Sequence, residues 1–214
     1  MYQTVLFDLD GTLTDPGQGI TNSVAYALKK HGIENTDRRE LYCFIGPPLL
    51  DSFMKYYGFS REEAMQAIYD YREYFSDRGI FENVPYEGVY SMLQSLRDHG
   101  KKLVLATSKP EEFALRILER FELARYFDLV VGATMDEKRS KKGDVIAHAL
   151  SLLQPEDLNS VVMVGDREHD ILGAKENGLQ AIGVLYGYGS REELEQAGAM
   201  AVAETIRDIP SLLL

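Results

Sequence analysis

Residues 5–15 read VLFDLDGTLTD, a short apolar run that leads into two aspartates and a glycine. The run lacks polar alternation, which is typical of a strand covered by helices on both faces. Asp8 and Asp10 are alternate residues at the end of this expected strand, so their side chains point the same way. Open α/β sheets bind ligands at the carboxyl ends of their strands. Carboxylates this close repel each other, and a metal ion is the simplest relief.

The pattern of the first run returns along the chain. We expect strands at residues 4–9, 102–106, 129–133, 160–164 and 181–185, with helical segments between them. This alternation predicts an α/β fold with a Rossmann-like parallel sheet.

Residues 16–84 depart from that rhythm, because they contain three helical segments and no convincing strand. We expect these residues to form an inserted, all-helical domain, the helical cap. Residues 1–15 and 85–214 are expected to form the catalytic core. Ser60 and Glu63 predict a capping box at one helix start. Apolar and long side chains then recur at helical spacing, at Met65, Ile68, Tyr69, Arg72 and Phe75.

Turn-forming residues flank the helical cap and suit a linker of two strands. They are Gly17 and Gly19 at its entry, and Asn83, Pro85 and Gly88 at its exit.

The composition limits the classes of partner and the cellular compartment that we expect. The 23 Lys and Arg against 34 Asp and Glu give a net charge of -11, which disfavours nucleic acid and membrane lipid as partners. The single cysteine, Cys43, has no internal partner for a disulfide. We find no secretory leader, and no apolar run near the ~20 residues of a membrane helix. We expect a cytoplasmic, soluble monomer.

A hydroxyl pair, Thr107 and Ser108, ends the second expected strand just before a helix. Free N–H groups at a helix start favour anions, so phosphate fits this corner. The alternative is that Ser108, with Glu111 three residues later, only caps that helix.

Two later segments add a cation and further acids. Residues 139–143, RSKKG, offer Lys141 or Lys142 to neutralise a phosphoryl group, and their chemistry alone does not choose between them. Asp166 ends the fourth expected strand and Asp170 follows it. Oxygen ligands such as these suit magnesium. The alternative for Asp166 is a helix N-cap.

These four motifs together resemble the haloacid dehalogenase superfamily, in its phosphoglycolate-phosphatase-like branch with a small helical cap. They are DLDGTLTD from Asp8, ATS ending at Ser108, the lysine near 142, and GDREHD from Gly165 to Asp170. They occur in the family's order and span nearly the whole chain.

The resemblance implies a role for each acid. Asp8 is the nucleophile and a metal ligand, and Asp10 is the acid/base, whose backbone carbonyl also binds the Mg²⁺ cofactor. Asp166 is a metal ligand, and Asp170 orients the metal shell or the lysine.

The resemblance also implies phosphate contacts from the Thr107 hydroxyl, the Ser108 amide and a lysine. It favours Lys142 over Lys141, because the family's lysine leads its helix. The cap segment with Gly46, Pro47 and Pro48 is expected to reach over the site and contact the leaving group.

The expected function is therefore a magnesium-dependent phosphatase for a small phosphomonoester, such as phosphoglycolate, a nucleotide or a sugar phosphate. It would work through an aspartyl phosphate on Asp8. A phosphomutase of the β-phosphoglucomutase type shares every motif and stays open, as does a phospho-acceptor module without turnover. A dehalogenase is disfavoured because Asp10 is present. Gly187-Tyr188-Gly189 is interpreted as a loop.

Overall fold

The computed structural model describes residues 2–34 and 37–214, and its main sheet has six parallel strands. Their order is β5-β4-β1-β6-β7-β8. The bounds are β1 Thr4–Phe7, β4 Lys102–Pro110, β5 Leu129–Ala133, β6 Val161–Gly165, β7 Gln180–Val184 and β8 Ala201–Ala203. The predicted α/β fold and its five expected strands are confirmed. The edge strand β8 was not predicted, because three residues are too few for a recognisable apolar run.

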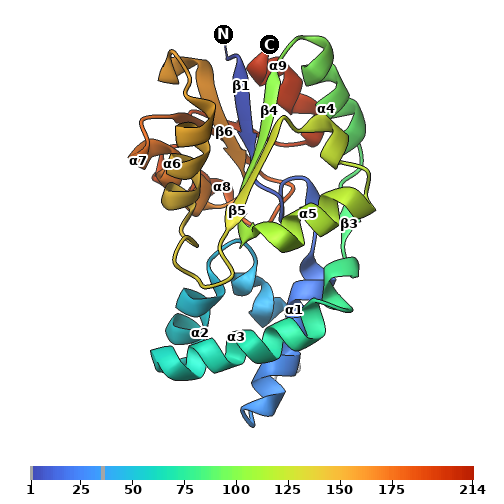
Figure 1. Ribbon diagram of the computed structural model, residues 1–214, viewed down its shortest axis with the longest axis vertical. Coiled ribbons are helices and arrows are strands. Elements are labelled where there is room, and N and C mark those ends of the chain that lie inside the picture. Colours follow the sequence, from blue (N-terminus) through green and yellow to red (C-terminus); the bar gives the residue numbers. More distant parts are fainter. Residues whose placement is uncertain (1, 35–36) are drawn as a thin grey trace.

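Helices cover both faces of this sheet, as Figure 1 shows. Successive strand residues face opposite sides: Val5 and Phe7 pack in one hydrophobic cluster, and Leu6 packs in the other. The first cluster lies under α4 Val89–Asp98, α5 Glu111–Arg120 and α9 Ile209–Leu213. The second lies under α6 Lys142–Leu153, α7 Glu168–Glu176 and α8 Arg191–Ala197. This double burial explains why the strands lack polar alternation.

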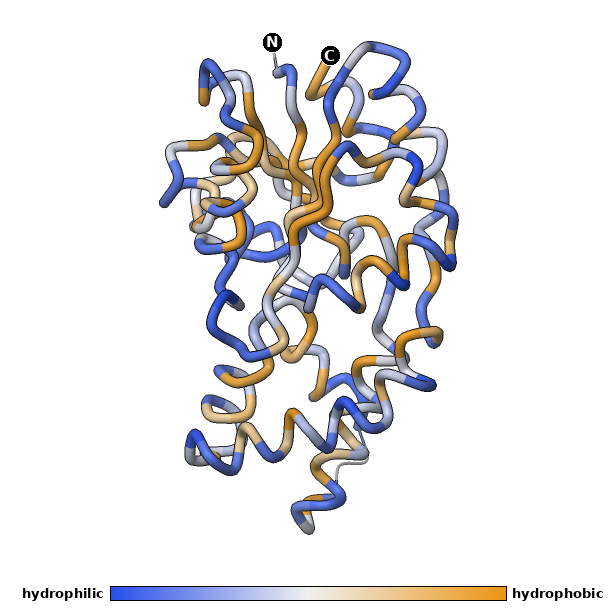
Figure 2. Tube along the Cα trace, in the orientation of Figure 1, coloured by the Kyte–Doolittle hydropathy of each residue, from blue (hydrophilic) through white to orange (hydrophobic). Residues whose placement is uncertain are grey.

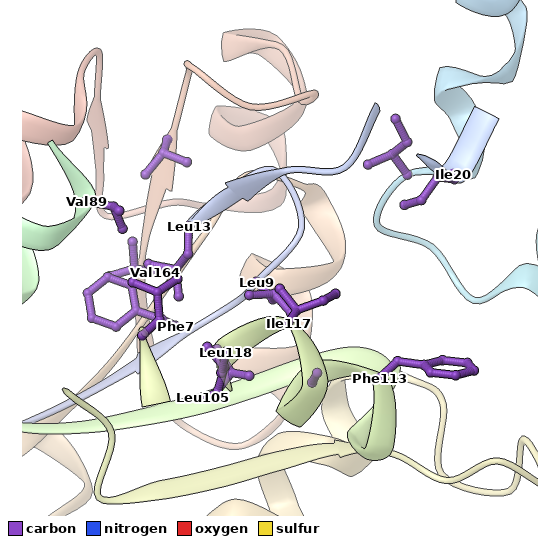
Figure 3. Close-up of a cluster of buried hydrophobic side chains, with 14 of the residues drawn as sticks. Phe7, Leu9, Leu13, Ile20, Val89, Leu105, Phe113, Ile117, Leu118 and Val164 are labelled. Atoms are coloured by element: carbon purple, nitrogen blue, oxygen red, sulfur yellow. The ribbon is translucent and has the colours of Figure 1, made fainter. Parts of the chain in front are cut away.

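The centre of the sheet is the most apolar part of the chain trace (Figure 2). Figure 3 shows Phe7 of β1 near Val164 and Leu105 of its two neighbouring strands, with Ile117 and Leu118 of α5 beside them. Short 3₁₀ helices η3 Ala124–Tyr126, η4 Leu158–Ser160 and η5 Ile206–Asp208 connect the outer elements.

The helical cap lies beyond one end of the sheet, opposite the chain termini (Figure 1). It contains α1 Gly17–Lys30, η1 Arg38–Phe44, α2 Leu49–Tyr57, α3 Arg61–Phe75 and η2 Gly79–Phe81. Its own core is aromatic: the Phe53 ring lies 4.9 Å from the Phe44 ring and 5.8 Å from the Phe59 ring. The predicted division into core and cap stays a prediction, and residues 1, 35 and 36 of its ranges lie outside the described residues.

Helix α3 begins with the predicted capping box. The Glu63 amide donates to the Ser60 hydroxyl at 3.2 Å, and the Ser60 amide donates to the Glu63 carboxylate at 2.8 Å. The spacing was less accurate about the buried face, since Tyr69 is 56% exposed whereas Tyr71 is buried. Helix α3 is buried on a wider surface than one apolar stripe. Besides its contacts within the cap, its residues Tyr71 and Phe75 line the cavity with Ser108 and Lys109 of β4.

Two short antiparallel strands, β2 Thr14–Asp15 and β3 Val84–Pro85, join the helical cap to the sheet. The predicted linker of two strands is confirmed. No helix in the described part of the chain combines the length and the apolar character that a membrane span requires.

Candidate active site

The site lies where strand order reverses. Strand β1 pairs with β4 on one side and β6 on the other, and Phe7 is in register with Leu105 and Val164. Their carboxyl ends therefore open at one place, which is where α/β sheets bind ligands. These ends carry Asp8, Thr107 and Asp166, and all three side chains are buried.

Lys142 is the cation at the centre of this site. Its Nζ atom lies 2.7 Å from Asp8 Oδ1 and 2.8 Å from Asp170 Oδ1, and it donates to the Ala106 carbonyl at 3.0 Å. Helix α6 begins at Lys142, so this side chain reaches the strand ends, whereas Lys141 is exposed. Of the two lysines that the sequence left open, Lys142 is the one placed beside Asp8.

Two carboxylates contact this amine, and a third, that of Asp166, lies beside them. Asp8, Asp166 and Asp170 each place an oxygen within 4.8 Å of the others, and all three are buried. With one ammonium among them, two negative charges stay uncompensated when all three are ionised. Burial, followed by the charges of Asp170 and Asp8, raises the pKa of Asp166 well above its usual value, and burial raises that of Asp170 to about 6. A hard divalent cation such as Mg²⁺ fits this all-oxygen cluster.

The role expected for Asp170, which is to orient the metal shell or the lysine, stays a prediction. One of its oxygens lies within 4.8 Å of oxygens of Asp8 and Asp166, so its position also suits a metal ligand. The Asp10 side chain, by contrast, is not part of this cluster.

Backbone from distant segments holds Asp166. The Tyr188 amide donates to its Oδ2 at 2.8 Å, and the Thr12 hydroxyl lies 3.4 Å from its Oδ1. Gly11 has a φ of 81°, and a Cβ there would lie 2.2 Å from the same carboxylate, so a side chain would displace it. The segment around Tyr188, interpreted only as a loop, thus supports the acid. The N-cap alternative for Asp166 is wrong, since α7 begins at Glu168 after Arg167.

Asp10 faces a second buried lysine. Its Oδ2 lies 2.6 Å from Lys109 Nζ, and its Oδ1 is buried with no hydrogen-bond partner among the described residues. Burial raises the pKa of Asp10, although the charge of Lys109 opposes this. Lys109 Nζ also lies 4.6 Å from the centre of the Phe75 ring. The sequence reasoning missed Lys109, although it directly follows Thr107 and Ser108.

The hydroxyl pair lies within β4, which continues to Pro110, beyond the predicted strand end at residue 106. Thr107 Oγ1 accepts from the Lys109 amide at 3.3 Å, and Ser108 Oγ is buried without a hydrogen-bond partner among the described residues. The alternative that Ser108 caps the next helix is wrong. Helix α5 begins at Glu111 after Pro110, and Glu111 instead accepts from the Gly132 amide at 3.1 Å.

A cavity of about 50 Å³ lies between these strand ends and the helical cap. Asp10, Ser108 and Lys109 form its core side. The predicted cap residues Gly46, Pro47 and Pro48 line the opposite side, together with Ile20, Phe44, Leu49, Tyr71, Arg72 and Phe75. Arg72 bridges to the core at the rim, 2.5 Å from Glu137 and 3.0 Å from the Met135 carbonyl.

Several known proteins are similar to this chain in sequence or in fold. The sequence model of the haloacid dehalogenase-like hydrolases matches residues 5–184. A 5'-nucleotidase of Pseudomonas aeruginosa is 46% identical over 90% of this chain and 87% of its own length. Tyrosine-protein kinase PtkA of Mycobacterium tuberculosis is 38% identical over 99% of this chain and 72% of its own length. The crystal structure of a predicted phosphatase from Clostridium acetobutylicum superposes with a TM-score of 0.98 at 49% identity, covering 100% of this chain and 98% of that one.

Proposed function

The chain belongs to the haloacid dehalogenase-like hydrolase family and is an enzyme of the phosphatase type, and we propose that it is a magnesium-dependent hydrolase of a small phosphomonoester. The observation that carries the proposal is the position of Asp8. Its carboxylate lies at the end of the central strand, 2.7 Å from Lys142 and within 4.8 Å of Asp166 and Asp170.

In the proposed first step, Asp8 attacks phosphorus. An Asp8 oxygen–phosphorus bond forms, the bond from phosphorus to the leaving oxygen breaks, and Asp10 gives that oxygen its proton. Lys142 holds Asp8 Oδ1 and so fixes the rotation of the carboxylate. The raised pKa of Asp10, caused by burial, suits a proton donor.

In the second step, water attacks the phosphorus of the aspartyl phosphate. Asp10 takes the proton of this water, and the bond from phosphorus to Asp8 breaks. The unpartnered Oδ1 of Asp10 is available for both proton transfers. Asp8, Asp166 and Asp170 would hold Mg²⁺, which offsets negative charge on the phosphoryl group when it is bound.

The Thr107 hydroxyl, the buried Ser108 hydroxyl and Lys142 are the proposed phosphate contacts. Residues of the core and of the helical cap both line the cavity beside Asp10. Movement of the helical cap away from the strand ends would admit substrate, and its return would exclude bulk water from the reaction.

The decisive experiment measures phosphate release from a panel of small phosphomonoesters, with Mg²⁺ or with chelator, for the wild type and Asp8→Asn. We expect Mg²⁺-dependent release that falls by about 10⁴-fold or more in Asp8→Asn. The panel includes nucleoside 5'-monophosphates, since one relative is named a 5'-nucleotidase. Full turnover by a folded Asp8→Asn protein would refute the mechanism. Transfer of the phosphoryl group from Asp8 to a sugar phosphate instead of water would show that the protein is a phosphomutase and not a phosphatase.

A further inference from the structure

Arg167 lies between two acids of the site in the sequence, Asp166 and Asp170, but its side chain hydrogen-bonds to neither. It follows Asp166, and its backbone amide donates to Asp170 Oδ2 at 3.1 Å. The backbone of Arg167 therefore contacts the carboxylate cluster, whereas its side chain makes contacts elsewhere.

The side chain of Arg167 contacts the helical cap. Its Nη1 donates to the Ile45 carbonyl at 2.6 Å, and its Nε donates to Glu193 Oε1 at 2.8 Å. The same Glu193 oxygen accepts from the Glu168 amide at 2.9 Å, which fixes Glu193 to the start of α7. A guanidinium can make both contacts at once because its donors form a rigid planar fork.

The cap segment that accepts this hydrogen bond is built to lie against Arg167. Gly46 has a φ of 101°, and a Cβ there would lie 2.8 Å from Arg167 Cγ. The next residues, Pro47 and Pro48, form one wall of the cavity. The Arg167–Ile45 contact thus comes directly before the segment that lines the cavity with Asp10.

We propose that Arg167 is a positioning residue that holds the Gly46-Pro47-Pro48 wall against the site. Because its backbone is tied to Asp170, occupation of the carboxylate cluster and closure of the helical cap favour each other. Two sites that bias one conformational equilibrium are coupled in both directions. This inference rests on the proposed function, because it gives the closed cap a role in substrate binding.

Arg72 and Arg116 also bridge the helical cap and the core, and Arg116 provides a matched control. Arg116 of α5 donates to the Ser76 carbonyl at 2.7 Å, away from residues 45–48. Its removal deletes one arginine-to-carbonyl bridge without touching residues 45–48 or the carboxylate cluster. A second control, Arg191→Ala, removes an exposed charge from α8, where Arg191 pairs only with Glu195 and Glu204 among the described residues.

The test follows amide hydrogen exchange of residues 41–46 in the full chain, with chelator, with Mg²⁺, and with Mg²⁺ plus inorganic phosphate. We expect Mg²⁺ and phosphate to slow exchange by about ten-fold in the wild type, in Arg116→Ala and in Arg191→Ala. Arg167→Ala should lose this slowing. Arg167→Lys should restore only part of it, because an ammonium lacks the fork that reaches Glu193 and Ile45 together.

Steady-state kinetics on the same variants supply the second readout. In Arg167→Ala we expect KM to rise by about ten-fold and kcat to fall by a smaller factor, since the side chain touches neither Asp8 nor Asp10. Wild-type exchange and wild-type KM in Arg167→Ala would overturn the inference. If that variant does not fold, Glu193→Ala decides, because it frees the guanidinium without removing it. Wild type that releases no phosphate would refute the proposed function, whereas the exchange data would still test the contact.

Discussion

Two buried lysines flank the carboxylates that follow β1, and their surroundings differ. Lys142 contacts Asp8 and Asp170, and Asp166 completes a cluster of three acids with them. Lys109 contacts one carboxylate, that of Asp10, and the face of Phe75. The first region has an excess of negative charge, and the second is balanced.

This difference separates two tasks within one short motif. The excess charge around Asp8 provides a reason to bind a divalent cation, whereas the Asp10 pair provides none. Asp8 and Asp10 are therefore acids of the same type in different electrostatic environments, which is how one site obtains both a nucleophile and a proton donor.

The largest effect is expected from Lys142→Met. It leaves three buried carboxylates without a cation, so in chelator the free energy of unfolding should fall by about 3–5 kcal/mol. Urea unfolding measures this loss. Phosphate release with Mg²⁺ should also fall by about 10³-fold. The exposed neighbour supplies the control: Lys141→Met should change stability by less than about 0.5 kcal/mol. Equal losses in the two variants would mean that the excess charge is not localised at Lys142.

The second effect concerns pH and metal. Burial raises the pKa of Asp170 from 3.8 to about 6, so the native state binds more protons than the unfolded state between these values. Without metal, stability should therefore fall as pH rises from about 4 to about 6. Thermal unfolding in chelator should show this fall, and Mg²⁺ should raise the Tm by about 5–10 °C at pH 7 but by less at pH 5. The control is Asp170→Asn, whose Tm should depend less on pH and on Mg²⁺.

A smaller loss of stability is expected from Lys109→Met. Asp10 is then left alone, but a single buried carboxyl can take up one proton and become neutral. The free energy of unfolding should fall by about 1–3 kcal/mol at pH 7, and Mg²⁺ should not restore it. A loss as large as that of Lys142→Met, or recovery with Mg²⁺, would erase the contrast between the two lysines.

The smallest effect is expected from Ser108→Ala. The Ser108 hydroxyl is buried without a partner in the described residues, so its removal should change stability by less than about 0.5 kcal/mol. If this hydroxyl instead serves phosphate, KM for a phosphomonoester should rise by about three-fold. Unchanged KM beside unchanged stability would remove the Ser108 hydroxyl, but not the Ser108 amide, from the proposed phosphate contacts.

The fold was largely predictable because strand burial shows directly in the sequence. Apolar runs identified five strands of the main sheet, and turn residues identified the β2–β3 linker. What failed was local: the three-residue β8 gives too little pattern, and Tyr69 followed the helical spacing but is exposed. Helix caps were also unreliable, since Ser60 caps α3 but Ser108 does not cap α5.

The candidate site was only partly predictable. The acids and hydroxyls at strand ends follow from the rule that parallel strands end at one edge, and the structure places Asp8, Thr107 and Asp166 together there. Lys109, Arg167 and Tyr188 were missed or given no role, although each adjoins a recognised motif or glycine pair. Their partners, Asp10, Ile45 and Asp166, belong to other segments of the chain, and no local pattern encodes such contacts.

The amino-acid sequence by itself determined the class of fold, the order of its elements and the residue types available for chemistry, because periodicity, turn residues and charge are local properties. The tertiary structure decided which groups meet: Lys142 rather than Lys141 at Asp8, Lys109 at Asp10, and Arg167 at the cap. The physical reason is that strand order and register bring together side chains over 30 residues apart, and burial among those partners then sets their charge and their pKa values.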